Sequence, residues 1–198
     1  MKPFLRMATQ QDAATVHAIY APFCDHTTVS FEVPAPSLEE MAARIRKITE
    51  QFPWLVCERA GEILGYAYAS PHRERAAYRW SVDVGIYVNP RCQRLGVGRA
   101  MYTAVFKILA LQGFYKAHAG IVLPNAPSVG LHEAMGFKPV GIYRGVGYKF
   151  GAWRDTGWWQ LALQDERPEP SEPRSVRAIE SSPDWQNALE AGANLLRA

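Results

Sequence analysis

The sequence is poor in cysteine and contains no long apolar run. Its 3 cysteines, Cys24, Cys57 and Cys92, share no C-x-x-C spacing, and the histidines show no ligand spacing. This pattern argues against a disulfide framework and against a metal site. No apolar run reaches the roughly 18 residues of a membrane span, and the N-terminal stretch MKPFLRMATQQD lacks the apolar segment of a secretory signal. We therefore expect a cytoplasmic protein without a metal or a membrane partner.

Apolar and aromatic residues are abundant. Hydrophobic residues make up 48% of the 198 residues and aromatic residues 12%, which is enough for a globular core. Residues 1–164 carry 18 basic and 12 acidic side chains, whereas residues 165–198 carry 4 and 7. The arginines of the basic part cluster at two sites and do not form one stripe, so we expect no nucleic acid partner.

The hydrophobic periodicity predicts alternating strands and helices. Strands are expected at 3–8, 54–60, 63–70, 80–89, 117–123, 138–148 and 153–163, and helices from residue 13, at 37–50, from 97 to 113 and at 126–135. The order βααβββαβαββ predicts an α/β protein in which a mixed sheet carries helices on its faces.

The composition changes near residue 164, so we predict a body at 1–164 and a tail at 165–198. The segment ERPEPSEPRS is rich in Pro, Glu and Ser and is typical of a linker or disordered tail. Trp185, Leu189, Leu195 and Leu196 permit a short terminal helix. We expect that helix to be marginal or disordered when isolated, because short helices are unstable in water.

Two glycines and three arginines lie between the strand at 80–89 and the following helix. The spacing of Gly96 and Gly98 does not fit G-x-x-x-x-G-K-[ST], because Gly98 is followed by Arg99 and not by Lys. It does not fit G-x-G-x-x-G either, because Met101 stands where the third Gly would be. The amides at a helix N-terminus favour an anion, and Arg94 and Arg99 can add charge. A glycine turn with solvated arginines explains the segment equally well on physical grounds alone.

The surrounding segments carry a family resemblance. Gln93–Gly98 fits the Q/R-x-x-G-x-G/A pyrophosphate loop of the GNAT acetyltransferases, and LPNAPS, LHEAMGF and GYKFGAW follow in order. The chain most resembles the phosphinothricin and methionine sulfoximine N-acetyltransferase subfamily, over about residues 4–163. The resemblance implies a GNAT fold (α+β), with a mostly antiparallel sheet splayed at its centre and helices on both faces. It also implies acetyl-CoA as cosubstrate and a homodimer.

The resemblance further implies where acetyl-CoA would bind. Backbone groups of Ile86, Tyr87 and Val88 would pair with the pantetheine arm as if it were another strand. Asn125 would bind near the thioester, and we favour this role over the alternative of a turn residue before a helix. The remaining implied contacts are Pro127 and Ser128 along the arm, and Gln93, Arg94, Leu95, Gly96, Val97, Gly98 and Arg99 at the pyrophosphate.

Asp83 and His132 are the candidate catalytic residues. The subfamily usually has Glu at the position of Asp83, and this side chain is one methylene shorter, so either a water relays the proton or the amine sits closer. A solvated strand Asp is the alternative. His132 stands where the resemblance places a proton donor for the thiolate, and a locally bonded helix His is equally compatible. We interpret Cys92 as a bystander, and His72 and His118, with the two other histidines, as surface or core residues.

The acceptor site is expected from two further segments. Phe31, Glu32 and Tyr78 match residues that line the subfamily's substrate pocket, and Arg73 and Arg75 lie on one side of an extended chain. Two arginines suit a carboxylate or phosphinate, so the acceptor is expected to be a small amino-acid-like molecule.

The predicted activity is therefore direct acetyl transfer from acetyl-CoA to an amine within a ternary complex. Phe150 stands where the subfamily often has His, which leaves the exact acceptor open. The alternatives are an N-acetyltransferase with another acceptor (a polyamine, an aminoglycoside or a protein N-terminus), or a non-catalytic CoA-binding sensor.

Overall fold

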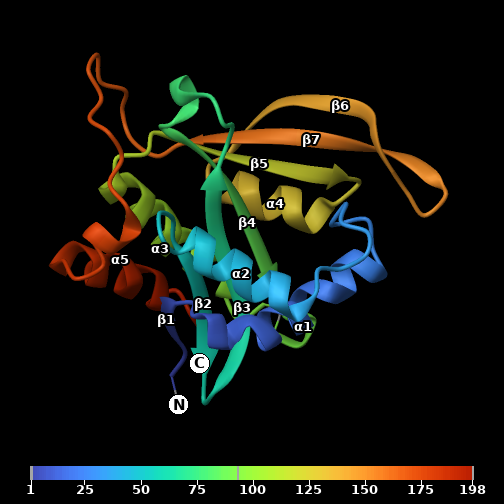
Figure 1. Cartoon of the computed structure of the whole chain (residues 1–198), viewed down its shortest axis with the longest axis horizontal. Helices are drawn as coiled ribbons and strands as arrows, with labels where there is room; N and C mark the ends of the chain where they lie inside the picture. The colour runs from blue at the N-terminus through green and yellow to red at the C-terminus, as the bar shows by residue number, and fades with distance from the viewer. Residues whose placement is uncertain (1, 93, 198) are drawn as a thin grey trace.

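A seven-stranded sheet with the strand order β1-β2-β3-β4-β5-β7-β6 forms the centre of the molecule (Figure 1). The computed structural model describes residues 2–92 and 94–197. The strands are β1 (Phe4–Met7), β2 (Trp54–Arg59), β3 (Glu62–Pro71), β4 (Ser81–Val88), β5 (Lys116–Leu123), β6 (Lys138–Lys149) and β7 (Ala152–Ala162). The helices are α1 (Ala13–Asp25), α2 (Leu38–Ile48), α3 (Val97–Gln112), α4 (Ala126–Ala134) and α5 (Pro183–Ala193). The predicted order of the elements up to β7 is confirmed.

Local sequence signals account for several boundaries. The hairpin between β2 and β3 turns at Ala60 and Gly61, with φ of 52° and 83°, as a two-residue hairpin turn requires. The helix α2 begins with a capping box, in which Ser37 Oγ accepts from the Glu40 amide and the Glu40 carboxylate accepts from the Ser37 amide. The helix α3 ends at Gly113, whose φ of 99° is left-handed.

Helices cover both faces of the sheet, and alternation along the strands decides which side chain meets which helix. Gly65 on β3 lies against Val97 of α3. The next residue, Tyr66, points the other way and stacks on Tyr87, whose ring meets Tyr20 of α1 at a centroid distance of 4.8 Å. The sheet is therefore sandwiched, with α1 and α2 on one side and α3 with α5 on the other (Figure 1).

The sheet opens beside β4. This strand runs parallel to β5 at only three positions, where Ser81, Val82 and Asp83 face Lys116, Ala117 and His118. Beyond Asp83, β4 stays paired with β3 as far as Val88, while β5 stays paired with β7. The two strands diverge, and the predicted splay at the centre of the sheet is present.

The tail departs from the expectation of a marginal or disordered segment. Val176, Ile179 and Trp185 are each at most 3% exposed, and they belong to the main core together with Ala188 and Leu196. An isolated helix of this length is unstable in water, but α5 docks its apolar face on α3 and β1. The possible terminal helix is thus present, while the domain boundary between residues 164 and 165 stays a prediction.

The tail also reaches the connection between β4 and α3. The Arg197 amide donates to the Leu95 carbonyl at 3.0 Å. A Cβ at Gly96 would lie 2.6 Å from the Leu195 carbonyl oxygen, so only glycine fits there.

Within the described residues, no helix has the length and the apolar content to cross a membrane.

Replacing Gly192 by Leu should destabilise the fold. A Cβ at this position would overlap the Ala100 carbonyl and lie 3.0 Å from the Ala104 Cβ. Overpacking of this kind costs about 1–3 kcal/mol, which lowers Tm by several degrees in a domain of this size. Calorimetry should show this fall, whereas Asn187→Leu on the exposed side of α5 should leave Tm nearly unchanged. Equal Tm values for the two variants would contradict the close α3–α5 contact.

Candidate functional site

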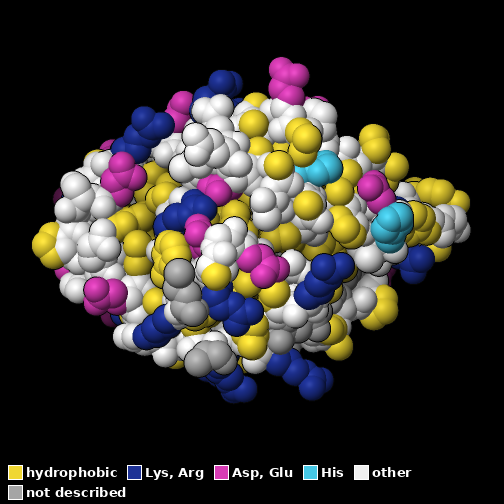
Figure 2. All heavy atoms as spheres, turned by 90° about the horizontal axis from the view of Figure 1, so that it is seen from below, with side chains coloured by type: hydrophobic (Ala, Val, Ile, Leu, Met, Phe, Trp, Pro, Cys, Tyr) yellow, Lys and Arg dark blue, Asp and Glu magenta, His cyan; other side chains and the backbone are white. Residues whose placement is uncertain are grey.

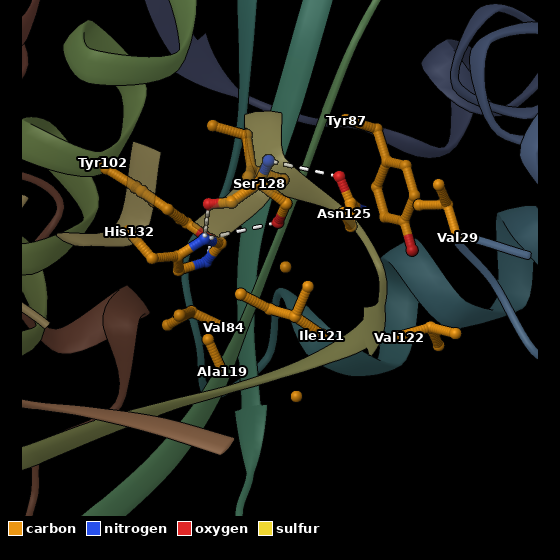
Figure 3. A pocket seen from close by; sticks show the side chains of 13 residues that line it. Val29, Val84, Tyr87, Tyr102, Ala119, Ile121, Val122, Asn125, Ser128 and His132 are labelled. Atoms are coloured by element: carbon orange, nitrogen blue, oxygen red, sulfur yellow. Dashed lines mark hydrogen bonds between the residues drawn. The ribbon is translucent and has the colours of Figure 1, made fainter. Parts of the chain in front are cut away.

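The opening between β4 and β5 contains a cavity of about 70 Å³. Its walls come from both strands, from α3 and from α4, and Figure 3 shows Val84, Ile121, Asn125 and His132 around it. The predicted contacts Ile86, Tyr87 and Ser128 also line the cavity. The apolar strand side chains and the polar α4 side chains therefore meet at the place where the sheet splits.

Asn125 begins α4 at the edge of this cavity. Its Oδ1 accepts from the Ser128 amide at 3.2 Å, and Pro127 lies in the first turn of the helix (Figure 3). This is the arrangement of an N-cap residue. Within the described residues, the Asn125 side-chain amide donates no hydrogen bond. The capping oxygen is thus used by the fold, and the amide nitrogen remains for another partner.

His132 is buried and held at both ring nitrogens. Its Nδ1 lies 2.8 Å from the Ser128 carbonyl oxygen, and its Nε2 lies 2.8 Å from the Tyr102 hydroxyl oxygen. A carbonyl only accepts, so Nδ1 carries the proton and Nε2 accepts from Tyr102. Burial lowers the pKa of His132, against the effect of the Ser128 bond, and burial raises the pKa of Tyr102 well above its usual range. At neutral pH both groups are uncharged.

Tyr102 lines the same cavity and is not among the residues predicted from the sequence. It follows Gly98 by one helical turn and lies beside the apolar stripe of α3. The signal that could have found it is a hydroxyl on a fully buried part of a helix that begins at the glycine loop.

The glycine loop has the backbone shape of an anion-binding nest. Arg94 and Gly96 have φ of 66° and 80°, and α3 begins at Val97. Successive amides in such a conformation converge on one point. Gln93 lies outside the described residues. A Cβ at Gly98 would lie 3.1 Å from Leu131 Cδ2, so this glycine also lets α3 approach α4.

Positive charge surrounds this end of the molecule. Arg94 and Arg99 are exposed, and Leu95 and Val88 are half-buried at the same connection. Figure 2 shows the face at the lower edge of Figure 1, where β4 ends, with Lys and Arg side chains gathered in its lower half. The nest and its exposed arginines can bind a phosphate group.

A second cavity, of roughly 650 Å³, lies beyond the C-terminal end of β3. His72, Arg73, Arg75 and Tyr78 line it, so the structure brings the three predicted acceptor residues of this segment together. Arg73 donates to the His72 carbonyl at 2.9 Å, and its guanidinium stands 5.7 Å from the centre of the Trp158 ring. The wall is therefore cationic and partly aromatic.

Phe31 and Glu32 lie apart from this cavity and line neither of the two cavities. The Glu32 carboxylate pairs with Arg44 of α2 at 2.7 Å. Phe31 packs against Gly147 of β6. The buried Lys149 ammonium donates to the carbonyls of residues 24, 30 and 32 and fixes this segment. The structure gives these two residues a place in the α1–α2 connection.

Asp83 lies at the point where β4 leaves β5. Its Oδ1 is 2.6 Å from His72 Nδ1. Burial raises the pKa of the Asp83 carboxyl, and the bond from His72 opposes that rise. The ring of His118 stacks on His72 at 4.1 Å. The interpretation of His72 and His118 as surface or core residues is therefore incomplete, since both adjoin Asp83.

The register of two strands could have revealed His72. Ser70 faces Asp83 across β3 and β4, so a residue two positions after Ser70 falls beside that carboxylate. Regular ligand spacing along the chain does not reveal such a pair, because the two residues are neighbours across a hairpin. Cys92 is buried, and burial raises the pKa of its thiol, in keeping with its interpretation as a bystander.

Comparison with known proteins decides the family. The model of the Acetyltransferase (GNAT) domain matches residues 5–158. The chain is a GNAT acetyltransferase. A phosphinothricin N-acetyltransferase of Streptomyces viridochromogenes is 41% identical to this acetyltransferase over 175 residues, which cover 88% of this chain and 93% of the relative.

Two further relatives agree with this assignment. An L-methionine sulfoximine/L-methionine sulfone acetyltransferase of Pseudomonas aeruginosa is 32% identical over 86% of this chain and 100% of the relative. The crystal structure of a GNAT superfamily phosphinothricin acetyltransferase from Sinorhizobium meliloti, in complex with AcCoA, is 33% identical with a TM-score of 0.82. It covers 88% of this chain and 96% of its own. The protein is thus an acetyl-CoA-dependent N-acetyltransferase.

The residues of the acetyltransferase fit this cosubstrate. The β4 edge beyond Asp83 faces no strand on the β5 side among the described pairings. The cavity beside that edge is apolar on the strands and polar on α4, and the nest at Arg94–Gly96 follows at the end of β4. The open strand edge, the cavity and the anion-binding nest lie in an order that fits an extended molecule carrying a pyrophosphate.

Proposed function

We propose that this enzyme acetylates the amine of a small amino-acid-like acceptor of the phosphinothricin, methionine sulfoximine or methionine sulfone type. The observation that carries the proposal is the second cavity. It places Arg73 and Arg75 on the same wall as His72, which is hydrogen-bonded to Asp83. An amino acid presents a carboxylate and an ammonium a short distance apart, and this wall offers a partner for each. The names of the relatives support the same acceptor class.

Acetyl-CoA supplies the acetyl group as an activated thioester. The backbone groups of Ile86, Tyr87 and Val88 bind its extended arm, because no described strand pairs with them on the β5 side. The Asn125 amide lies near the carbonyl, and Pro127 and Ser128 flank the arm. The amides of the loop, with Gln93, Arg94, Leu95, Gly96, Val97, Gly98 and Arg99, hold the pyrophosphate.

Tyr102 is the proton donor on the thiolate side. Tyr102 lines the cavity, and its hydroxyl stays protonated at neutral pH because burial raises its pKa. His132 accepts a hydrogen bond from Tyr102 and is itself anchored to the Ser128 carbonyl. His132 thus contributes by holding the Tyr102 hydroxyl in place, and the proton that goes to the leaving sulfur is the hydroxyl's own.

Asp83 provides the negative charge on the amine side. An ammonium ion must lose a proton before its nitrogen can attack a carbonyl carbon. The carboxylate attracts the ammonium to the point where β4 leaves β5. Phe31 and Glu32 line neither cavity, so their role in the acceptor site stays a prediction. A polyamine or an aminoglycoside needs an acidic cavity, so the arginine-lined wall favours an acceptor that carries a carboxylate.

We also propose a cytoplasmic location, with no nucleic acid, membrane or metal as partner. Three unpaired, buried cysteines suit a reducing compartment. Cell fractionation would test the location, and recovery of the protein with membranes would contradict it.

The first experiment follows free-thiol release with acetyl-CoA and each of the three acceptors. Arg75→Ala should raise KM for the acceptor by roughly 10- to 150-fold, since a charged hydrogen bond is worth about 1.5–3 kcal/mol. The acetyl-CoA dissociation constant should not change. Arg46→Ala, an exposed arginine on α2, is the matched control. Unchanged acceptor kinetics in Arg75→Ala would remove this residue from the site.

We further propose that two copies associate through the β6–β7 hairpin. The strand β6 is the outer edge of the sheet, and the hairpin extends from the body (Figure 1). It exposes Val140, Tyr148 and Trp153 at 63–68% of their surface. An apolar edge strand is suited to an isologous contact with its own copy.

Light scattering should return about twice the 22.2 kDa mass of one chain. Trp153→Asp combined with Tyr148→Asp should reduce this mass to that of one chain. Val33→Asp, an exposed apolar residue on the α1–α2 connection, is the control. A single-chain mass for the unmodified protein at micromolar concentration would contradict the dimer.

A further inference from the structure

The Asp83 carboxylate is hydrogen-bonded to a histidine. One of its carboxylate oxygens lies 2.6 Å from His72 Nδ1, and its side chain is 29% exposed. A carboxylate only accepts hydrogen bonds, so His72 carries its proton on Nδ1 and donates it to Asp83. The second nitrogen, Nε2, then has a free lone pair on the edge of the ring that points away from Asp83.

His72 lies between Asp83 and the arginine-lined cavity. The residue belongs to the cavity wall together with Arg73, Arg75 and Tyr78, and its side chain is 13% exposed. Within the described residues, Nε2 makes no hydrogen bond. We expect this lone pair, on a residue of the cavity wall, to be available to a proton of the acceptor.

We infer that His72 is the base that takes the proton from the acceptor ammonium, and that Asp83 orients it. This inference rests on the proposed function, because it concerns the amine bound in the same site. The imidazole extends the reach of the short Asp83 side chain toward the cavity by the width of one ring. His72 is the catalytic residue in this account, and Asp83 is a positioning residue that also stabilises the imidazolium.

The proton and bond changes balance without another reactant. The ammonium N–H bond breaks and the Nε2–H bond of His72 forms. The amine lone pair then forms the C–N bond as the C–S bond of the thioester breaks. The nitrogen loses its second proton to solvent. The sulfur leaves with the proton of the Tyr102 hydroxyl, which solvent then replaces. His72 returns its proton to solvent through the cavity.

Charged groups of both signs lie around His72. Asp83 faces it from β4 and offers a negative charge, while Arg73 and Arg75 in the β3–β4 connection bring positive charge to the same wall. Tyr78 lies edge-on at 5.9 Å, Glu74 belongs to the same wall, and Trp158 of β7 is uncharged. His118 of β5 stacks on the ring, and burial followed by the charge of His72 lowers its pKa. A neutral His118 adds no repulsion.

The same three side chains are close enough for a metal ion, with ligand atoms within 4.8 Å of one another. The orientation of the two imidazole rings argues against a metal site. The His72 and His118 rings are stacked at 4.1 Å with 14° between their planes. An imidazole nitrogen binds a metal in the plane of its ring, and two nearly parallel planes at this separation do not converge on one ion.

The test compares pH profiles of kcat/KM for thiol release with methionine sulfone. His72→Gln keeps an N–H group for Asp83 but removes the base, so the rate at pH 7 should fall about 10²–10⁴-fold. The acetyl-CoA dissociation constant should be retained. The deficit should shrink as pH rises toward the pKa of the acceptor amine, because solvent then supplies free amine. The exposed His26→Gln is the matched control.

A double-mutant cycle separates the two roles. If Asp83 acts through His72, the variant His72→Gln/Asp83→Asn should be no slower than His72→Gln alone, within about threefold. If Asp83 takes the proton itself, Asp83→Asn alone should be at least about tenfold slower than His72→Gln, and His72→Gln should keep the acidic limb of the wild-type profile. That outcome would overturn the inference.

A measurement without an acceptor keeps the inference distinct from the proposed function. If the wild-type enzyme acetylates none of the three acceptors, the proposed function fails. The nitrogen-15 NMR spectrum of the imidazole rings then decides about His72. A proton on Nδ1 at neutral pH, displaced to both tautomers in Asp83→Asn, supports the inference. A proton on Nε2 in the wild-type protein overturns it.

Discussion

The parallel pairing of β4 and β5 ends after three residue pairs, and the chemistry of the molecule is arranged around that point. Beyond it, the backbone of β4 has one free edge, and the cavity between the strands follows that edge. At the point itself, Asp83 and His118 are the last facing pair. A sheet that stayed paired to Val88 would satisfy the backbone of β4 and leave no place for an extended cosubstrate.

The opening separates two sets of proton carriers. On the side of β3, His72 is bonded to Asp83, close to solvent and to arginines. On the side of α3 and α4, the fully buried Tyr102 is bonded to His132, away from charge. Transfer of an acetyl group to an ammonium ion needs a proton acceptor at the nitrogen and a proton donor at the sulfur. The His72–Asp83 pair is partly exposed and lies beside charged groups, whereas the Tyr102–His132 pair is buried and stays neutral.

Much of this arrangement could be predicted from local patterns. Period-two alternation located β4, and the glycines located the start and end of α3, because these signals depend on neighbours in the chain. The docking of α5 could not be predicted this way, since its stability comes from Gly192 lying against Ala100 and not from helix propensity. His72 and Tyr102 were missed for a related reason. Their partners are Asp83 and His132, 11 and 30 residues away, and only the register of the fold brings them together.

The most direct test of the account is amide hydrogen exchange of the full chain with and without acetyl-CoA. With acetyl-CoA we expect slower exchange in two segments, 86–88 on the free edge of β4 and 94–99 at the start of α3. Amides in the β6–β7 hairpin should exchange at the same rate in both samples, which makes the hairpin the internal reference. Unchanged exchange in both 86–88 and 94–99 at saturating acetyl-CoA would contradict the claim that the opening of the sheet is the cosubstrate site.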